Sequence, residues 1–226
     1  SKWKPLPGSE REGQQVAHLL SSRLISGPTA TTTELLRQQG PRVLHIATHG
    51  FFVPDQTSPT TDPLGVVQQK APQLQALRAE DLQLRSGLVF AGANQPDLDP
   101  KDDGYLTAAE AVNLNLKGTE LVVLSACSTG QGEVRTGEGV YGLQRSLTVA
   151  GARSTLLSLW KVDDAATAAF MERYYRRLKA GEGRSDALAT VQKEFRDGTA
   201  GDGQWKEPYY WAAGQLVGDW RPIKDL

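Results

Sequence analysis

Three short apolar runs limit the folds open to this chain more than any other feature. They cover residues 43–48, 121–126 and 154–160, and the second is almost continuously aliphatic. Short, continuously apolar runs are typical of strands that are buried on both faces. A helical pattern over residues 140–149 ends at Gly151 and joins the second run to the third. Strand, helix, strand in this order predicts an α/β fold, with a mostly parallel β-sheet sandwiched between helices.

Three helix starts are predicted by capping boxes, in which a serine or threonine and a glutamate three positions later satisfy free backbone amides. The boxes run from Ser9 to Glu12, from Thr31 to Glu34 and from Thr107 to Glu110. We expect the second of these helices to end at Gly40 and Pro41.

The remaining elements follow from periodicity and from turn residues. We predict long helices over residues 165–179 and 185–196, and a small hairpin that pairs 87–91 with 104–106. The aromatic tail, residues 208–220, is expected to pack on the domain.

Composition excludes several classes of function. The 25 Lys and Arg residues balance 26 Asp and Glu residues, so no basic surface for nucleic acid or for an anionic membrane is expected. No apolar run approaches the roughly 18 residues that span a bilayer. The single cysteine rules out an internal disulfide and a multi-cysteine metal site, and it favours a reducing, cytoplasmic location. We expect an activity that needs no cofactor.

The length of 226 residues predicts a single domain over residues 1–226. The only methionine is Met171, so the first residue is not an initiator. We therefore expect this domain to be a piece of a longer protein, with regulation by an upstream region or a partner protein.

A histidine and a cysteine follow two of the predicted strands. His49 comes directly after the first run and Cys127 directly after the second. Ligands of open parallel sheets bind beyond the carboxyl ends of the strands, where two neighbouring strands would bring an imidazole and a thiol together. The competing interpretation is an inert core cysteine. Gly50 favours the reactive pair, because its amide and that of Cys127 can stabilise an oxyanion.

Two other patterns resemble parts of known binding sites. His45 and His49 have the spacing of half a zinc site, but on a strand they would lie roughly 13 Å apart, so His45 is expected to be a buried structural residue. The glycines of residues 130–139 invite a nucleotide-binding interpretation, yet the Gly-Lys-Ser/Thr of a P-loop is missing. A loop that covers the active site explains the same glycines.

Several motifs in combination resemble one family of proteins. They are LHIATHG at 44–50, LSACSTG at 124–130, AGAR at 150–153, SLWKVDD at 158–164 and PYYWA at 208–212. Nearly the whole chain resembles the CHAT family, which comprises caspase-like domains associated with tetratricopeptide repeats, mostly in bacteria. The resemblance implies the caspase-haemoglobinase fold and peptide-bond hydrolysis, with His49 as base, Cys127 as nucleophile, and Gly50 with Cys127 as oxyanion amides.

The resemblance also bears on the substrate. Metacaspases carry an acidic residue two positions before the cysteine, where this chain has Ser125. The segment from Trp160 to Asp164 is similar to one in separases, whose aspartate at the position of Asp164 contacts substrate arginine. Asp163 or Asp164 could instead cap the next helix, and an apolar pocket lined by Trp160 and its neighbours would then prefer leucine or methionine.

These observations together predict a cysteine endopeptidase that cuts a protein partner at a defined site, after a basic residue. Asp164, Asp163 and Trp160 are the predicted substrate-binding residues. The alternatives are a non-catalytic CHAT module for interaction or signalling and a flavodoxin-like ligand-binding domain.

Overall fold

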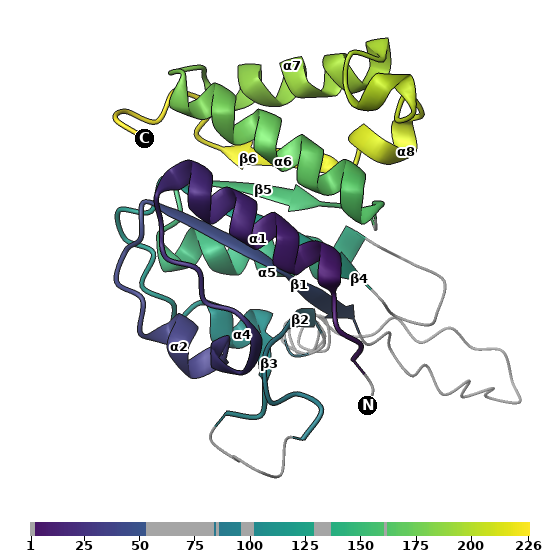
Figure 1. The fold of residues 1–226 in the computed structure, drawn as a ribbon. Helices are drawn as coiled ribbons and strands as arrows, with labels where there is room; N and C mark the ends of the chain where they lie inside the picture. Colours follow the sequence, from purple (N-terminus) through teal and green to yellow (C-terminus); the bar gives the residue numbers. More distant parts are fainter. Residues whose placement is uncertain (1–2, 53–83, 85, 96–101, 129–136, 161) are drawn as a thin grey trace, which may run out of the picture.

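The computed structural model describes residues 3–52, 84, 86–95, 102–128, 137–160 and 162–226. One six-stranded sheet, in the order β3-β2-β1-β4-β5-β6, forms the centre of the molecule (Figure 1). The strands are β1 (Val43–Phe52), β2 (Ser86–Val89), β3 (Tyr105–Thr107), β4 (Leu121–Ser128), β5 (Ser154–Ser158) and β6 (Gly214–Gly218).

Parallel pairing is confined to the middle of the sheet. β4 lies between β1 and β5 and pairs parallel with both. β2 and β3 continue the sheet on the β1 side as an antiparallel hairpin, and β6 pairs antiparallel with β5 at the opposite edge. The predicted α/β class, the parallel strands and the hairpin are therefore confirmed, whereas the edge strand β6 was not predicted.

Helices cover both faces of the sheet. On one of the faces, α1 and α6 lie side by side (Figure 1). The helices of three turns or more are α1 (Pro7–Leu20), α5 (Gly137–Ala150), α6 (Asp164–Lys179) and α7 (Arg184–Asp197). The shorter ones are α2 (Thr32–Leu36), α4 (Ala108–Ala111) and α8 (Pro208–Trp211).

The two faces bury separate apolar clusters. Val123 of β4 packs with side chains of α1, α6 and α7, including Val16, Phe170 and Phe195. The neighbouring residue Val122 belongs to the second cluster, with side chains of α2, α4 and α5. Successive strand residues thus point to opposite faces and both are covered, which explains the continuous apolar runs in the sequence.

Several predicted boundaries were wrong. β1 continues to Phe52 and β4 to Ser128, so His49 and Cys127 lie within the last residues of their strands rather than beyond them. α2 ends at Leu36, well before Gly40 and Pro41. α5 begins at Gly137, so the last glycines of the predicted loop are helical, and residues 129–136 lie outside the described residues.

Two of the three predicted capping boxes involve the expected contacts. Thr107 and Glu110 form the complete reciprocal box, and the Thr31 hydroxyl accepts from the amide of Glu34. The box from Ser9 to Glu12 was wrong: α1 begins at Pro7, without a side-chain cap. The side chain of Glu12 is turned into the protein instead.

Among the residues that the structure describes, no helix combines the length and the apolar character needed to cross a bilayer.

Candidate functional site

His49 and Cys127 are register partners in the parallel pairing of β1 with β4. They occupy the carboxyl-terminal ends of two adjacent strands, where open parallel sheets bind ligands. Ile46 of β1 and residues 121–124 of β4 are buried in the core and fix this register, because a slip of one residue would turn each apolar side chain to the wrong face. The structure thus brings together the two residues that the sequence predicts as a pair.

The imidazole of His49 is oriented by a backbone carbonyl. Its Nε2 lies 2.7 Å from the carbonyl oxygen of Lys4, in the segment before α1. A carbonyl can only accept, so Nε2 donates and carries the proton. The lone pair of the neutral ring is then on Nδ1, which is buried and has no hydrogen-bond partner among the described residues.

This geometry fits a general base. A base that takes a thiol proton needs a free lone pair and a fixed ring orientation, and a third group that bonds the far side of the ring supplies both. In His49 the far side is held by Lys4. No signal in the sequence pointed to Lys4, because the contact uses the backbone rather than the side chain.

Gly50 was predicted to follow the end of its strand, and that premise was wrong. It is buried inside β1 and is the register partner of Leu88 on one side and of Ser128 on the other. The assignment of its amide and that of Cys127 to an oxyanion stays a prediction.

His45 forms part of a buried polar network on the same strand. Its Nε2 lies 2.8 Å from Oε1 of Glu12, and its Nδ1 lies 2.8 Å from the hydroxyl of Tyr175. The hydroxyl of Ser125 donates to the other oxygen of Glu12. Burial, together with the nearby Tyr174 and Glu12, raises the pKa of Tyr175 well above its usual value, so its hydroxyl stays protonated.

Both ring nitrogens of His45 and both carboxylate oxygens of Glu12 therefore have a hydrogen-bond partner. The side chain of His45 is 8% exposed and that of Glu12 is 4% exposed. The prediction that His45 is a buried structural residue is confirmed, and both of its ring nitrogens are engaged. In the described ranges, no three His, Cys, Asp or Glu side chains gather as a metal cluster would require.

Sequence reasoning missed the role of Glu12. The residue lies four positions before Val16, on the helical stripe that faces the sheet, and both residues are buried. A carboxylate on an apolar stripe was a signal of a buried partner, because an unpaired buried charge is very costly. The predicted capping box instead assigned this carboxylate to the start of the helix.

The predicted substrate-binding residues have different surroundings. Asp163 caps α6, since its Oδ1 accepts from the amides of Ala165 and Ala166. Asp164 is exposed, and no hydrogen bond or ion pair joins its carboxylate to any residue that the structure describes. The indole of Trp160 donates to the carbonyl of Tyr209.

Asp164 also lies against the start of α1. A Cβ added at Gly8 would be 2.2 Å from Cγ of Asp164, so only a glycine permits this approach. The first turn of α1, Asp164 and the segment that carries Lys4 are thus neighbours at the edge of the sheet where β1 and β4 end.

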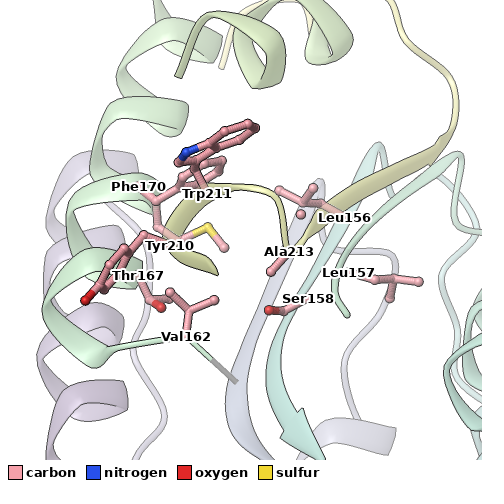
Figure 2. A pocket seen from close by; sticks show the side chains of 11 residues that line it. Leu156, Leu157, Ser158, Val162, Thr167, Phe170, Tyr210, Trp211 and Ala213 are labelled. Atoms are coloured by element: carbon pink, nitrogen blue, oxygen red, sulfur yellow. The ribbon is translucent and has the colours of Figure 1, made fainter. Parts of the chain in front are cut away.

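An apolar pocket opens at the carboxyl end of β5, the strand next to β4 (Figure 2). Its empty space is about 360 Å³, including the part that is open to solvent. Side chains of β5, α6, α8 and adjoining segments line it, among them Leu156, Val162, Phe170, Met171 and Trp211. Trp160, which was expected to line such a pocket, is not among the lining residues.

A layered α/β domain with a histidine and a cysteine in register at the ends of adjacent parallel strands defines the caspase-like class. The family model of the CHAT domain matches residues 1–219, and the chain belongs to this family. The predicted family and its caspase-like fold are therefore confirmed.

Two curated relatives match nearly the whole chain. Tetratricopeptide repeat protein 28 of Homo sapiens is 28% identical over 219 residues, which are 96% of this chain and 8% of that protein. Its counterpart from Mus musculus is 27% identical over the same share of this chain and 9% of its own length. The chain thus spans less than a tenth of these relatives, whose names bear out the association with tetratricopeptide repeats. Bacterial origin and cytoplasmic location stay predictions.

Proposed function

We propose that this domain is a cysteine endopeptidase in which Cys127 is the nucleophile and His49 the general base. The observation that carries the proposal is the register pairing of these residues on β1 and β4, with His49 held by Lys4 in the form whose Nδ1 is free to accept a proton. A free thiol has a pKa of roughly 8.5, and a neighbouring imidazole can lower it enough to give thiolate at neutral pH.

The reaction follows from these roles. Nδ1 of His49 takes the thiol proton, and the sulfur of Cys127 attacks the carbonyl carbon of the scissile peptide bond. The resulting oxyanion is stabilised by backbone amides, for which we propose Gly50 and Cys127. The imidazolium then donates its proton to the leaving amine, and water hydrolyses the thioester to release the second product.

For specificity we propose cleavage after arginine or lysine, with Asp164 as the partner of the basic side chain. Its exposed carboxylate has no partner among the described residues, whereas Asp163 is engaged as a helix cap. Charge-assisted hydrogen bonds of this kind contribute on the order of 1.5 to 3 kcal/mol. The competing candidate is the apolar pocket of Figure 2, which would prefer leucine or methionine.

A covalent probe tests the catalytic proposal directly. Because Cys127 is the only cysteine of the chain, a peptidyl acyloxymethyl ketone should label it stoichiometrically, and mass spectrometry gives the site and the extent. Iodoacetamide labelling of the unfolded chain provides the control for thiol content. Cys127→Ala should abolish cleavage of a peptide library while the circular dichroism spectrum stays unchanged.

The alternative, a non-catalytic CHAT module for interaction or signalling, predicts a different result. An unactivated thiol would not react with the peptidyl electrophile, and no peptide would be cut at any ratio of protein to substrate. We further propose that a protein is the substrate and that sequence or a partner outside this chain regulates the site. The isolated chain should then cleave more slowly than the whole protein of which it is part.

A further inference from the structure

The segment that orients His49 is itself held by three side-chain contacts. The side-chain amide of Asn94 pairs with the backbone of Trp3: Oδ1 accepts from the Trp3 amide at 2.9 Å, and Nδ2 donates to the Trp3 carbonyl at 2.8 Å. The indole of Trp3 donates to the hydroxyl of Tyr105 at 2.9 Å. Residue 3 is therefore fixed in both its backbone and its side chain.

These contacts converge on the histidine. The rings of Trp3 and His49 lie with their centroids 5.3 Å apart, and the next carbonyl along the chain, that of Lys4, bonds Nε2. Tyr105 in turn donates to the carbonyl of Ala93, beside Asn94. The contacts thus connect the β2–β3 region to the far side of the His49 ring.

We infer that Asn94, Tyr105 and Trp3 form a clamp that positions His49 for the proposed reaction, by holding the Lys4 carbonyl on Nε2. This inference rests on the proposed function for its consequence in catalysis. None of the three is a catalytic residue; each acts through Lys4. The lone pair on Nδ1 depends on that carbonyl, because without it the neutral ring is free to place its proton on either nitrogen.

The side chain of Asn94 is well suited to hold the backbone of Trp3. Asn94 is exposed and its amide satisfies a donor and an acceptor of one residue, which no charged or aliphatic side chain can do. Among the residues that the structure describes, the titratable groups on the segments around His49 include Cys127 on β4, Tyr105 on β3, Lys4, and Asp164 at the start of α6. A change in the pH dependence of the thiol after mutation of Asn94 would therefore report the state of His49.

The test compares Asn94→Ala with Asn115→Ala, in the full chain. Asn115 is also exposed and bonds Gln39 through its side chain, away from the clamp, so it is a matched control. The first readout is the ¹⁵N spectrum of the histidine rings, with the His49 signals assigned through His49→Gln. Wild type and Asn115→Ala should show the proton on Nε2, and Asn94→Ala should show a mixture of the two forms.

The second readout is the rate of Cys127 alkylation by iodoacetamide against pH, which needs no substrate recognition. Asn94→Ala should lower the rate about tenfold near pH 7 and leave it unchanged near pH 10, where the thiol ionises unaided. Tyr105→Phe removes only the hydroxyl that holds the indole and should change both readouts in the same direction. If Asn94→Ala fails to fold, the two readouts on Tyr105→Phe test the clamp instead.

Wild-type ring signals and alkylation profiles in both folded variants would overturn the clamp. Absence of peptide cleavage in every variant would instead count against the proposed function. Even without any cleavage, the ¹⁵N signals of the His49 ring still test the clamp, because they depend neither on substrate nor on turnover.

Discussion

Nε2 of His49 lies 2.7 Å from the carbonyl oxygen of Lys4, so a main-chain atom, and not a side chain, orients the proposed base. Lys4→Ala keeps that carbonyl and should therefore leave the rate of peptide cleavage within about twofold of wild type. Steady-state kinetics on one peptide substrate measure this. A loss as large as that of His49→Ala would show that the Lys4 side chain, which is exposed, has a role of its own.

The two histidines of β1 should respond differently to replacement. His49→Ala removes the proposed base and should slow peptide cleavage by about a hundredfold or more, with little change in stability. His45→Ala leaves Glu12 and Tyr175 without their shared partner and should lower the free energy of unfolding by about 3 kcal/mol. Urea denaturation and cleavage assays on both variants check this. The opposite pattern would mean that the two roles have been assigned the wrong way round.

Glu12 should be important for stability. Glu12→Gln places an amide group where two donors, from His45 and Ser125, require acceptors, and the mismatch should cost about 1 to 3 kcal/mol. Glu10→Gln, an exposed change in the same helix, should cost less than about 0.5 kcal/mol. Equal urea midpoints for the two variants would show that the network adds nothing to stability.

The proposed preference for basic residues can be tested at two positions. Asp164→Asn should reduce cleavage after arginine about ten- to a hundredfold and leave cleavage after leucine unchanged. Gly8→Ala should have the same selective effect without a change of charge, because the new Cβ would displace the Asp164 carboxylate.

Gly13→Ala is the control within α1, since its Cβ would meet only the end of the flexible Leu24 side chain, at 3.1 Å. Paired peptides that differ only in arginine or leucine before the cut bond give the measurement. Equal loss on both peptides, or no loss on either, would contradict the role of Asp164 and favour the apolar pocket.

Asp102 gives a prediction for acid stability. Burial raises the pKa of Asp102, but hydrogen bonds from Thr32 and Thr33 outweigh it and lower the pKa from 3.8 to about 2. A lowered pKa in the folded state stabilises the protein above the unfolded value of 3.8, and this contribution is lost as the pH falls towards 2. Asp102→Asn should therefore be less stable than wild type at pH 6, and thermal melts should converge as the pH approaches about 2. A constant difference at all pH values would contradict the assignment.

Much of the central sheet could be predicted from the sequence because burial on both faces leaves a continuous apolar signature. Val122 and Val123 point to opposite sides and both are covered, so residues 121–124 are all aliphatic. β6 has no such signature, since its residues are only half-buried at the edge of the sheet. β6 begins at Gly214 and ends at Gly218, and in a sequence glycines at such spacing are typical of turns.

The paired positions of His49 and Cys127 could also be anticipated, because residue type and strand position are both visible in a sequence. The contacts of Lys4, Glu12 and Gly8 could not, since each joins segments that are distant in the chain or uses a backbone atom. The place of Glu12 on the apolar stripe of its helix indicates a buried carboxylate, but it does not indicate which distant residues the carboxylate contacts.

The pairing of β1 with β4 has a consequence for how the domain is made. His49 and Cys127 are close in space but distant in the chain, with β2, β3 and α4 between them. Such long-range parallel contacts form slowly, because the chain must lose the entropy of closing a large loop before the contacts between the strands can stabilise it. During synthesis the ribosome releases the histidine strand well before the cysteine strand exists. A nascent chain therefore carries no reactive pair, and the proposed peptidase becomes competent only once the centre of its sheet is complete.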